Sequence, residues 1–132
     1  MIPSERFSNR VHDYISGRPS YPASAVFWLG DTFGLSPPAM IADVGSGTGI
    51  SAALLISHGY DVVGIEPNDA MREAAIERLG ADPQFRAIAA FAEATTLPDA
   101  SMDAVIAAQA FHWFDRERFR AECLRILKPN GV

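Results

Sequence analysis

Three alternating glycines beside one carboxylate are the residues of this sequence whose spacing most clearly indicates chemistry. Gly45, Gly47 and Gly49 follow a short apolar run that contains Asp43, and a helix-forming stretch begins directly after them. Glycine adopts positive φ at no steric cost and lets a ligand approach the main chain, because it has no Cβ. The first turn of the next helix adds free N–H groups and a positive dipole end. The pattern therefore predicts a loop that cradles a nucleotide-like ligand.

A dinucleotide is one ligand that fits this loop. Residues 47–52 match the Gly-x-Gly-x-x-Ala fingerprint, and Glu66 lies 19 positions after Gly47, close to where the fingerprint expects an acid. Spacing alone therefore leaves NAD, and with it an NAD-dependent oxidoreductase, as an open interpretation.

Strand-like and helix-like segments alternate along the rest of the chain. Asn68 is the expected N-cap of one helix and Gly80 its end. Strands are expected before the glycine loop and at 61–65, 85–89 and 103–107, and helices at 51–57, 68–80 and 116–127. Such alternation gives right-handed βαβ units and a parallel sheet covered on both faces. The predicted fold class is α/β.

The helix predicted at 116–127 combines apolar and charged positions. Its apolar face is expected to contain Phe119, Cys123, Leu124 and Leu127. The interleaved charges, Glu117 and Glu122 among them, are interpreted as a solvated surface.

The two ends of the chain differ from the centre. Residues 1–38 are predicted to form an N-terminal helical cap, and residues 39–132 the ligand-binding core of a single domain. Val132 is expected to begin a further strand, so the core should be C-terminally incomplete, with the strand near Val105 exposed along an unpaired edge. That edge offers a route to self-association.

Composition excludes several classes of protein. The chain has 132 residues, 48% of them hydrophobic, and a net charge of −5, as expected for a globular domain that does not have nucleic acid as its main partner. No apolar run reaches the roughly 18 residues of a membrane span. We therefore expect no membrane association and a cytoplasmic location. Cys123 is the single cysteine and is interpreted as structural, and the three histidines lack metal-ligand spacing, so no metal site is predicted.

The glycine loop resembles motif I of the class I S-adenosylmethionine-dependent methyltransferases. The motif reads hydrophobic-x-Asp-x-Gly-x-Gly-x-Gly and is matched by Ile41, Asp43, Gly45, Gly47 and Gly49. The resemblance implies that Asp43 lies near the methionine ammonium group of the cofactor, directly or through water. A carboxylate here favours a cationic, sulfonium-bearing ligand over a pyrophosphate, which it would repel.

Further segments extend the resemblance. Residues 62–67 are similar to the second strand of these enzymes, which implies that Glu66 accepts both ribose hydroxyls. Residues 91–98 resemble the adenine loop, with Phe91 where the family commonly has Asp, so the backbone at Ala92 and Glu93 is left to contact the adenine edge.

One branch of the family, the type 11-like small-molecule methyltransferases, is matched most closely. Its Ala-Gln-Ala-x-His-Trp motif is similar to residues 108–113, its Leu-Lys-Pro-Gly-Gly turn to 127–131, and its Arg-Pro-x-Tyr-Pro opening to 18–22. The resemblance implies a Rossmann-like parallel sheet of order 3-2-1-4 whose fifth to seventh strands are missing.

The resemblance also implies a function and a set of site residues. The function is methyl transfer from S-adenosyl-L-methionine to a small-molecule acceptor, with a truncated cofactor-binding module of little turnover as the alternative. His112 is a candidate general base whose other interpretation is packing beneath the following helix. The expected cofactor-binding residues are Tyr14, Asp43, Gly45, Ser46, Gly47, Gly49, Glu66, Pro67, Ala92, Glu93 and Gln109.

Overall fold

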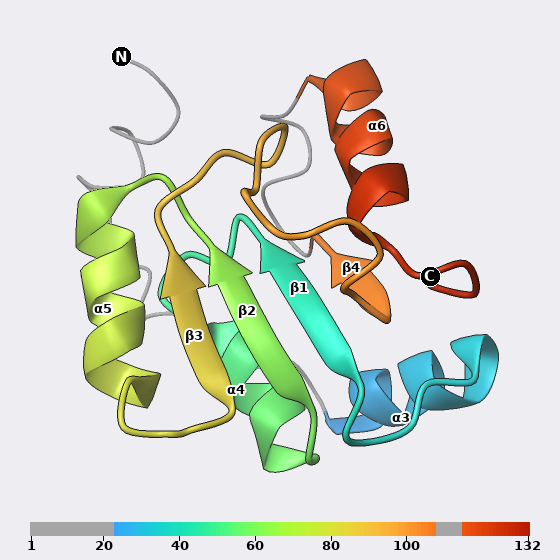
Figure 1. Cartoon of the computed structure of the whole chain (residues 1–132). Helices are drawn as coiled ribbons and strands as arrows, with labels where there is room; N and C mark the ends of the chain where they lie inside the picture. Colours follow the sequence, from blue (N-terminus) through green and yellow to red (C-terminus); the bar gives the residue numbers. More distant parts are fainter. Residues whose placement is uncertain (1–22, 108–114) are drawn as a thin grey trace.

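A four-stranded parallel sheet forms the centre of the computed structural model, which describes residues 23–107 and 115–132. The strand order is β3-β2-β1-β4, as the sequence predicts. The strands are β1 (Met40–Val44), β2 (Asp61–Ile65), β3 (Phe85–Ile88) and β4 (Ala104–Ile106), and the helices are α3 (Ala23–Phe33), α4 (Ile50–Ser57), α5 (Asp69–Leu79) and α6 (Arg116–Ile126). In Figure 1 the arrowheads of β1, β2 and β3 point to one edge, called here the carboxyl edge of the sheet.

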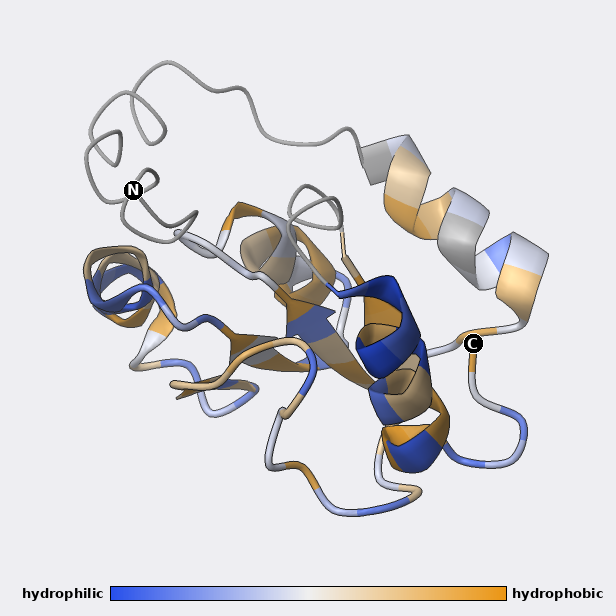
Figure 2. Ribbon diagram, turned by 90° about the horizontal axis from the view of Figure 1, so that it is seen from above, coloured by the Kyte–Doolittle hydropathy of each residue, from blue (hydrophilic) through white to orange (hydrophobic). Residues whose placement is uncertain are grey.

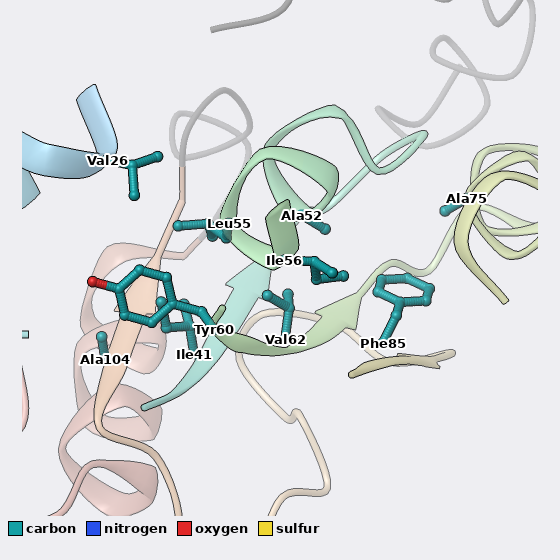
Figure 3. Close-up of a cluster of buried hydrophobic side chains, with 10 residues drawn as sticks. All are labelled: Val26, Ile41, Ala52, Leu55, Ile56, Tyr60, Val62, Ala75, Phe85 and Ala104. Atoms are coloured by element: carbon teal, nitrogen blue, oxygen red, sulfur yellow. The ribbon is translucent and has the colours of Figure 1, made fainter. Parts of the chain in front are cut away.

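Helices cover both faces of the sheet, and each face has its own apolar cluster. On one face, side chains from α3, α4 and α5 pack with Ile41 and Val62 of the strands (Figure 3). On the other, Phe119 and Ile126 of α6 belong to the cluster that contains Val44 and Ile65. Figure 2 shows the apolar strands between helices of mixed character. The division follows from strand geometry, because successive side chains point to opposite faces.

The expected helix boundaries in the centre of the chain are confirmed. The Asn68 side chain accepts a hydrogen bond from the Met71 N–H at 2.9 Å, which caps α5, and the helix ends at Leu79, directly before Gly80. Gly59 follows α4 with φ of 94°, a conformation that glycine adopts without strain.

The predicted apolar face of α6 is partly wrong. Leu124 is 65% exposed, whereas Ile126 is 1% exposed and Glu122, which was expected on the solvated surface, is buried. The buried positions Phe119, Glu122 and Ile126 follow a spacing of three and four, so the inward stripe is rotated away from Leu124.

The outer edge of β4 differs from the expectation of an unpaired strand. The Val105 N–H donates to the Val132 carbonyl at 2.9 Å, and the Val132 N–H donates to the Asp103 carbonyl at 3.1 Å. Val132 therefore begins to pair with β4, as its sequence pattern indicates, and the backbone near Val105 is not left open. Within the described ranges, no helix is long and apolar enough to cross a membrane.

The corrected face of α6 predicts unequal effects of two truncations. Ile126→Ala should lower the free energy of unfolding by about 2–4 kcal/mol, because it opens a cavity in the buried cluster. Leu124→Ala should change it by less than about 0.5 kcal/mol, since that side chain is mostly in water. Urea denaturation of both variants measures the difference, and equal losses would contradict the observed face.

Candidate functional site

The glycine loop joins β1 to α4 by a left-handed path. Gly45, Gly47 and Gly49 have φ of 69°, 57° and 88°, which confirms the expected positive φ at every second position. The N–H groups of Gly45 and Ser46 both donate to the Ile65 carbonyl, at 2.8 and 3.1 Å. The loop is thus tied to the last residue of β2 before it enters α4. A side chain at any of the three glycines would strain this backbone.

Close packing adds a second constraint on the same loop. A Cβ on Gly49 would lie 3.1 Å from Leu79 Cδ1 and 3.3 Å from Ala75 Cβ, both on α5. A Cβ on Gly64 in β2 would lie 2.9 Å from Ser46 Oγ. The loop is therefore held between α5 and β2, and Ser46 lies against β2.

Glu66 lies directly after β2 and bridges two loops at the carboxyl edge. One carboxylate oxygen accepts from the Gly47 N–H at 2.9 Å, and the other accepts from the Asn68 N–H at 2.9 Å. Burial raises the pKa of Glu66, against the lowering effects of those two N–H groups and of the Arg72 charge. A carboxylate has about four lone-pair positions, and these two bonds use two of them. Two further donors, such as a pair of hydroxyls, would find acceptors here.

Asp43 lies in β1, on the face covered by α4. It is 2% exposed, and its Oδ2 atom has no hydrogen-bond partner among the described residues; the same holds for the buried Oγ1 of Thr48. Burial, and next the negative charge of Glu66, raises the pKa of Asp43 to about 7. Such an orphaned acid indicates a binding group, since buried polar atoms are otherwise paired.

These residues fit the S-adenosylmethionine that the sequence predicts. A cationic group near Asp43 would offset both the burial and the repulsion by Glu66. A pyrophosphate would add negative charge next to two acids. Arg72 is the basic side chain beside Glu66, and its Nη1 donates to the Glu66 backbone carbonyl at 2.9 Å. The polar groups of the site, two carboxylates and a glycine turn, thus suit a zwitterion with hydroxyls.

The predicted adenine loop follows β3. The Glu66 N–H donates to the Ile88 carbonyl at 3.0 Å, so the ends of β2 and β3 lie together at the carboxyl edge. Beyond it, Ala92 is buried, Glu93 is half-buried and Phe91 is 62% exposed. Pro67, also half-buried, continues from Glu66. The structure therefore gathers the predicted residues of 43–49, 66–67 and 92–93 at one edge of the sheet.

Some site residues lie outside the prediction or outside the described ranges. Tyr14, Gln109 and His112 are among the residues that the structure does not describe, so their roles stay predictions. Thr48 was not predicted as a site residue, and the burial of Glu122 was not predicted either. For Glu122 a signal exists, because an acid that falls three residues after Phe119 and four before Ile126 lies on the apolar face. Among the described residues, no group of three His, Cys, Asp or Glu is placed to hold a metal ion.

Comparison with known families now identifies the class. The methyltransferase domain family matches residues 42–132, from the middle of β1 onward. This is more than half of the chain and includes the whole glycine loop, Glu66 and the predicted adenine loop at 91–98. The chain belongs to the class I S-adenosylmethionine-dependent methyltransferases.

Individual relatives agree with the family. An uncharacterized methyltransferase of Mycobacterium tuberculosis is 39% identical over 127 residues, which are 95% of this chain and 49% of that protein. A Saccharomyces cerevisiae protein named as a probable S-adenosylmethionine-dependent methyltransferase is 32% identical over 140 residues, or 99% of this chain and 47% of that one.

A solved structure from Anaeromyxobacter dehalogenans that bears a type II methyltransferase name superposes with a TM-score of 0.73 and 36% identity, covering 86% of this chain and 46% of its own. The chain spans about half the length of the curated relatives that it matches.

The raised pKa of Asp43 predicts an unusual pH dependence of stability. The unfolded chain loses the Asp43 proton near pH 4, whereas the folded chain keeps it up to about pH 7. The free energy of unfolding should therefore fall as the pH rises from 4 to 7, by on the order of 3 kcal/mol from this group. Urea denaturation at pH 5 and pH 8 should show this drop in the wild type and a smaller one in Asp43→Asn.

Asp31→Asn is the matched control, because Asp31 is exposed on α3. Its pH dependence should equal that of the wild type. If Asp43→Asn also keeps the full wild-type drop, Asp43 is not the group that titrates near pH 7.

Proposed function

We propose that this protein binds S-adenosyl-L-methionine at the carboxyl edge of its sheet and transfers the methyl group to a small-molecule acceptor. The observation that carries the proposal is the pair of buried acids, Asp43 and Glu66, beside the left-handed glycine loop. Membership in the methyltransferase family supports the same ligand.

Each acid has a separate role in this proposal. Glu66 keeps acceptor capacity for the two ribose hydroxyls while it holds Gly47 and Asn68. Asp43 faces the cationic methionine end, where its orphaned oxygen gains a charge-assisted partner. The bare backbone of the glycine loop lets the ligand approach closely between them.

The cofactor supplies a methyl group already attached to a good leaving group. The chain then has to orient donor and acceptor in line, at roughly 3–3.5 Å, and exclude water. This explains why the site needs acceptors and a shaped loop rather than a nucleophile. Proton removal matters only for an acidic acceptor, and His112 remains the candidate base for that case.

The acceptor is proposed to be a small molecule. The chain carries a net charge of −5, which disfavours nucleic acid as the acceptor. The Ala-Gln-Ala-Phe-His-Trp segment at 108–113 supports the same assignment through its similarity to the small-molecule branch.

Calorimetric titration with S-adenosylhomocysteine and, separately, with NAD tests the cofactor. The homocysteine compound carries an ammonium group and two ribose hydroxyls, so it should bind, whereas the pyrophosphate of NAD should be repelled by the two acids. Binding of NAD without binding of S-adenosylhomocysteine would overturn the assignment.

Glu66→Gln tests the ribose contact. The amide has one acceptor oxygen in place of two, so S-adenosylhomocysteine affinity should fall by about 1–3 kcal/mol. Glu77→Gln, which makes the same change at an exposed position of α5, should bind as the wild type does. If Glu66→Gln retains wild-type affinity, Glu66 does not contact the ribose.

A further inference from the structure

One buried carboxylate joins the predicted adenine loop to α6. Glu122 of α6 is 8% exposed, and its Oε2 accepts from the Thr95 N–H at 2.7 Å and from the Thr95 hydroxyl at 2.6 Å. Thr95 is fully buried and lies 27 positions earlier in the sequence. A single side chain of α6 thus satisfies both donors of a residue that follows Glu93 by two positions.

The loop around Thr95 is tightly folded. The Ala94 N–H donates to the Phe91 carbonyl at 3.1 Å, and the Leu97 N–H donates to Thr95 Oγ1 at 3.3 Å. Between them Thr96 has φ of 67°, a left-handed conformation that costs free energy for any residue with a side chain. Such a turn persists only when its surroundings fix it, and Glu122 supplies the buried anchor.

Arg125 completes the network from the other side of Glu122. Its Nε and Nη2 donate to the two Glu122 oxygens at 2.8 Å each, and its Nη1 donates to Asp99 Oδ1 at 2.7 Å. The hydrogen bonds from Arg125, and after them those from Thr95, lower the pKa of Glu122 to about 2 although burial acts in the other direction. The carboxylate therefore stays ionised at neutral pH. The helix therefore holds both ends of the segment from Thr95 to Asp99.

Docking of α6 does not require this acid. Phe119 and Ile126 already place the helix in the apolar cluster, and the Ile126 carbonyl accepts from the N–H groups of Ser101 and Met102. An acid on an apolar face loses its hydration, and this loss destabilises the fold unless hydrogen-bonding partners offset it. Its partners outside α6 belong to Thr95, which indicates that the bonds serve the loop.

We propose that Glu122 is a positioning residue for cofactor selection. It holds the turn at Thr95 so that the backbone of Ala92 and Glu93 meets the adenine edge of the bound cofactor. The proposal rests on the proposed function, because it requires S-adenosylmethionine at this edge. It assigns base selectivity to a side chain that does not itself touch the base.

The test compares two ligands that differ only at the base edge, S-adenosylhomocysteine and its hypoxanthine analogue S-inosylhomocysteine. A backbone that matches adenine leaves groups unpaired against hypoxanthine, so the wild type should prefer the adenine compound. Glu122→Gln should weaken S-adenosylhomocysteine roughly tenfold, because one charged acceptor of Thr95 is lost. It should weaken the hypoxanthine compound by only about two- to threefold, since little base contact remains to lose. The measured quantity is the ratio of the two affinities, which an equal loss of both would leave unchanged.

Two further variants sharpen the result. Glu117→Gln makes the same change at an exposed position of α6 and should keep the wild-type ratio. Thr95→Val removes the hydroxyl without leaving an unpaired charge, so it tests the proposal even if Glu122→Gln does not fold. In Thr95→Val, the preference for S-adenosylhomocysteine over S-inosylhomocysteine should also be smaller than in the wild type.

The outcomes separate the two proposals. A wild type that does not bind S-adenosylhomocysteine overturns the proposed function and this inference with it. A wild type that binds both compounds equally, or a folded Glu122→Gln or Thr95→Val variant with an unchanged ratio, overturns the role of Glu122 alone.

Discussion

The site depends on the parallel pairing of β1 with β2. The register sets Asp43 opposite Gly64 and Val44 opposite Ile65, so Glu66 emerges beside the glycine loop. The Ile65 carbonyl and the Glu66 carboxylate then accept three N–H groups of that loop, from Gly45, Ser46 and Gly47. A shift of one residue would turn Asp43 to the opposite face of the sheet and remove it from the α4 side. Strand register therefore decides whether the two acids act on one ligand.

This arrangement stores an unfavourable interaction. Two acids are buried close enough for Glu66 to raise the pKa of Asp43, and burial raises the pKa of Glu66 despite the nearby Arg72 charge. The parallel sheet and its two apolar clusters tolerate that cost. A cationic ligand relieves it, so part of the ligand affinity comes from repulsion already present in the folded chain. In the proposed function, this repulsion favours a cationic ligand group beside Asp43 over an anionic one.

Local sequence patterns predicted most of this fold. Glycine spacing, β-branched runs and the Asn68 cap act within a few residues, so they placed β1 to β4, α4 to α6 and the glycine loop. One error concerns the edge of β4, where Val132 pairs with Val105. The other concerns α6, where the burial of Glu122 depends on Thr95, 27 positions away. The spacing of Glu122 from Phe119 and Ile126 places it on the apolar face, but its partner Thr95 is distant in sequence, so no local pattern showed that a buried charge would be paired there. Thr48 was not predicted for a similar reason, because its burial comes from packing rather than from any local sequence pattern.

Glu66 and Glu122 use the same interaction for different ends. Glu66 accepts the N–H groups of Gly47 and Asn68, and Glu122 accepts the N–H group of Thr95, so each carboxylate fixes the backbone of a loop. Glu122 accepts four bonds, two from Thr95 and two from Arg125, which fill the lone-pair positions of a carboxylate. Glu66 accepts two from the described residues and has a raised pKa. The saturated acid is therefore suited to holding protein, and the unsaturated acid is suited to binding a ligand that brings its own donors.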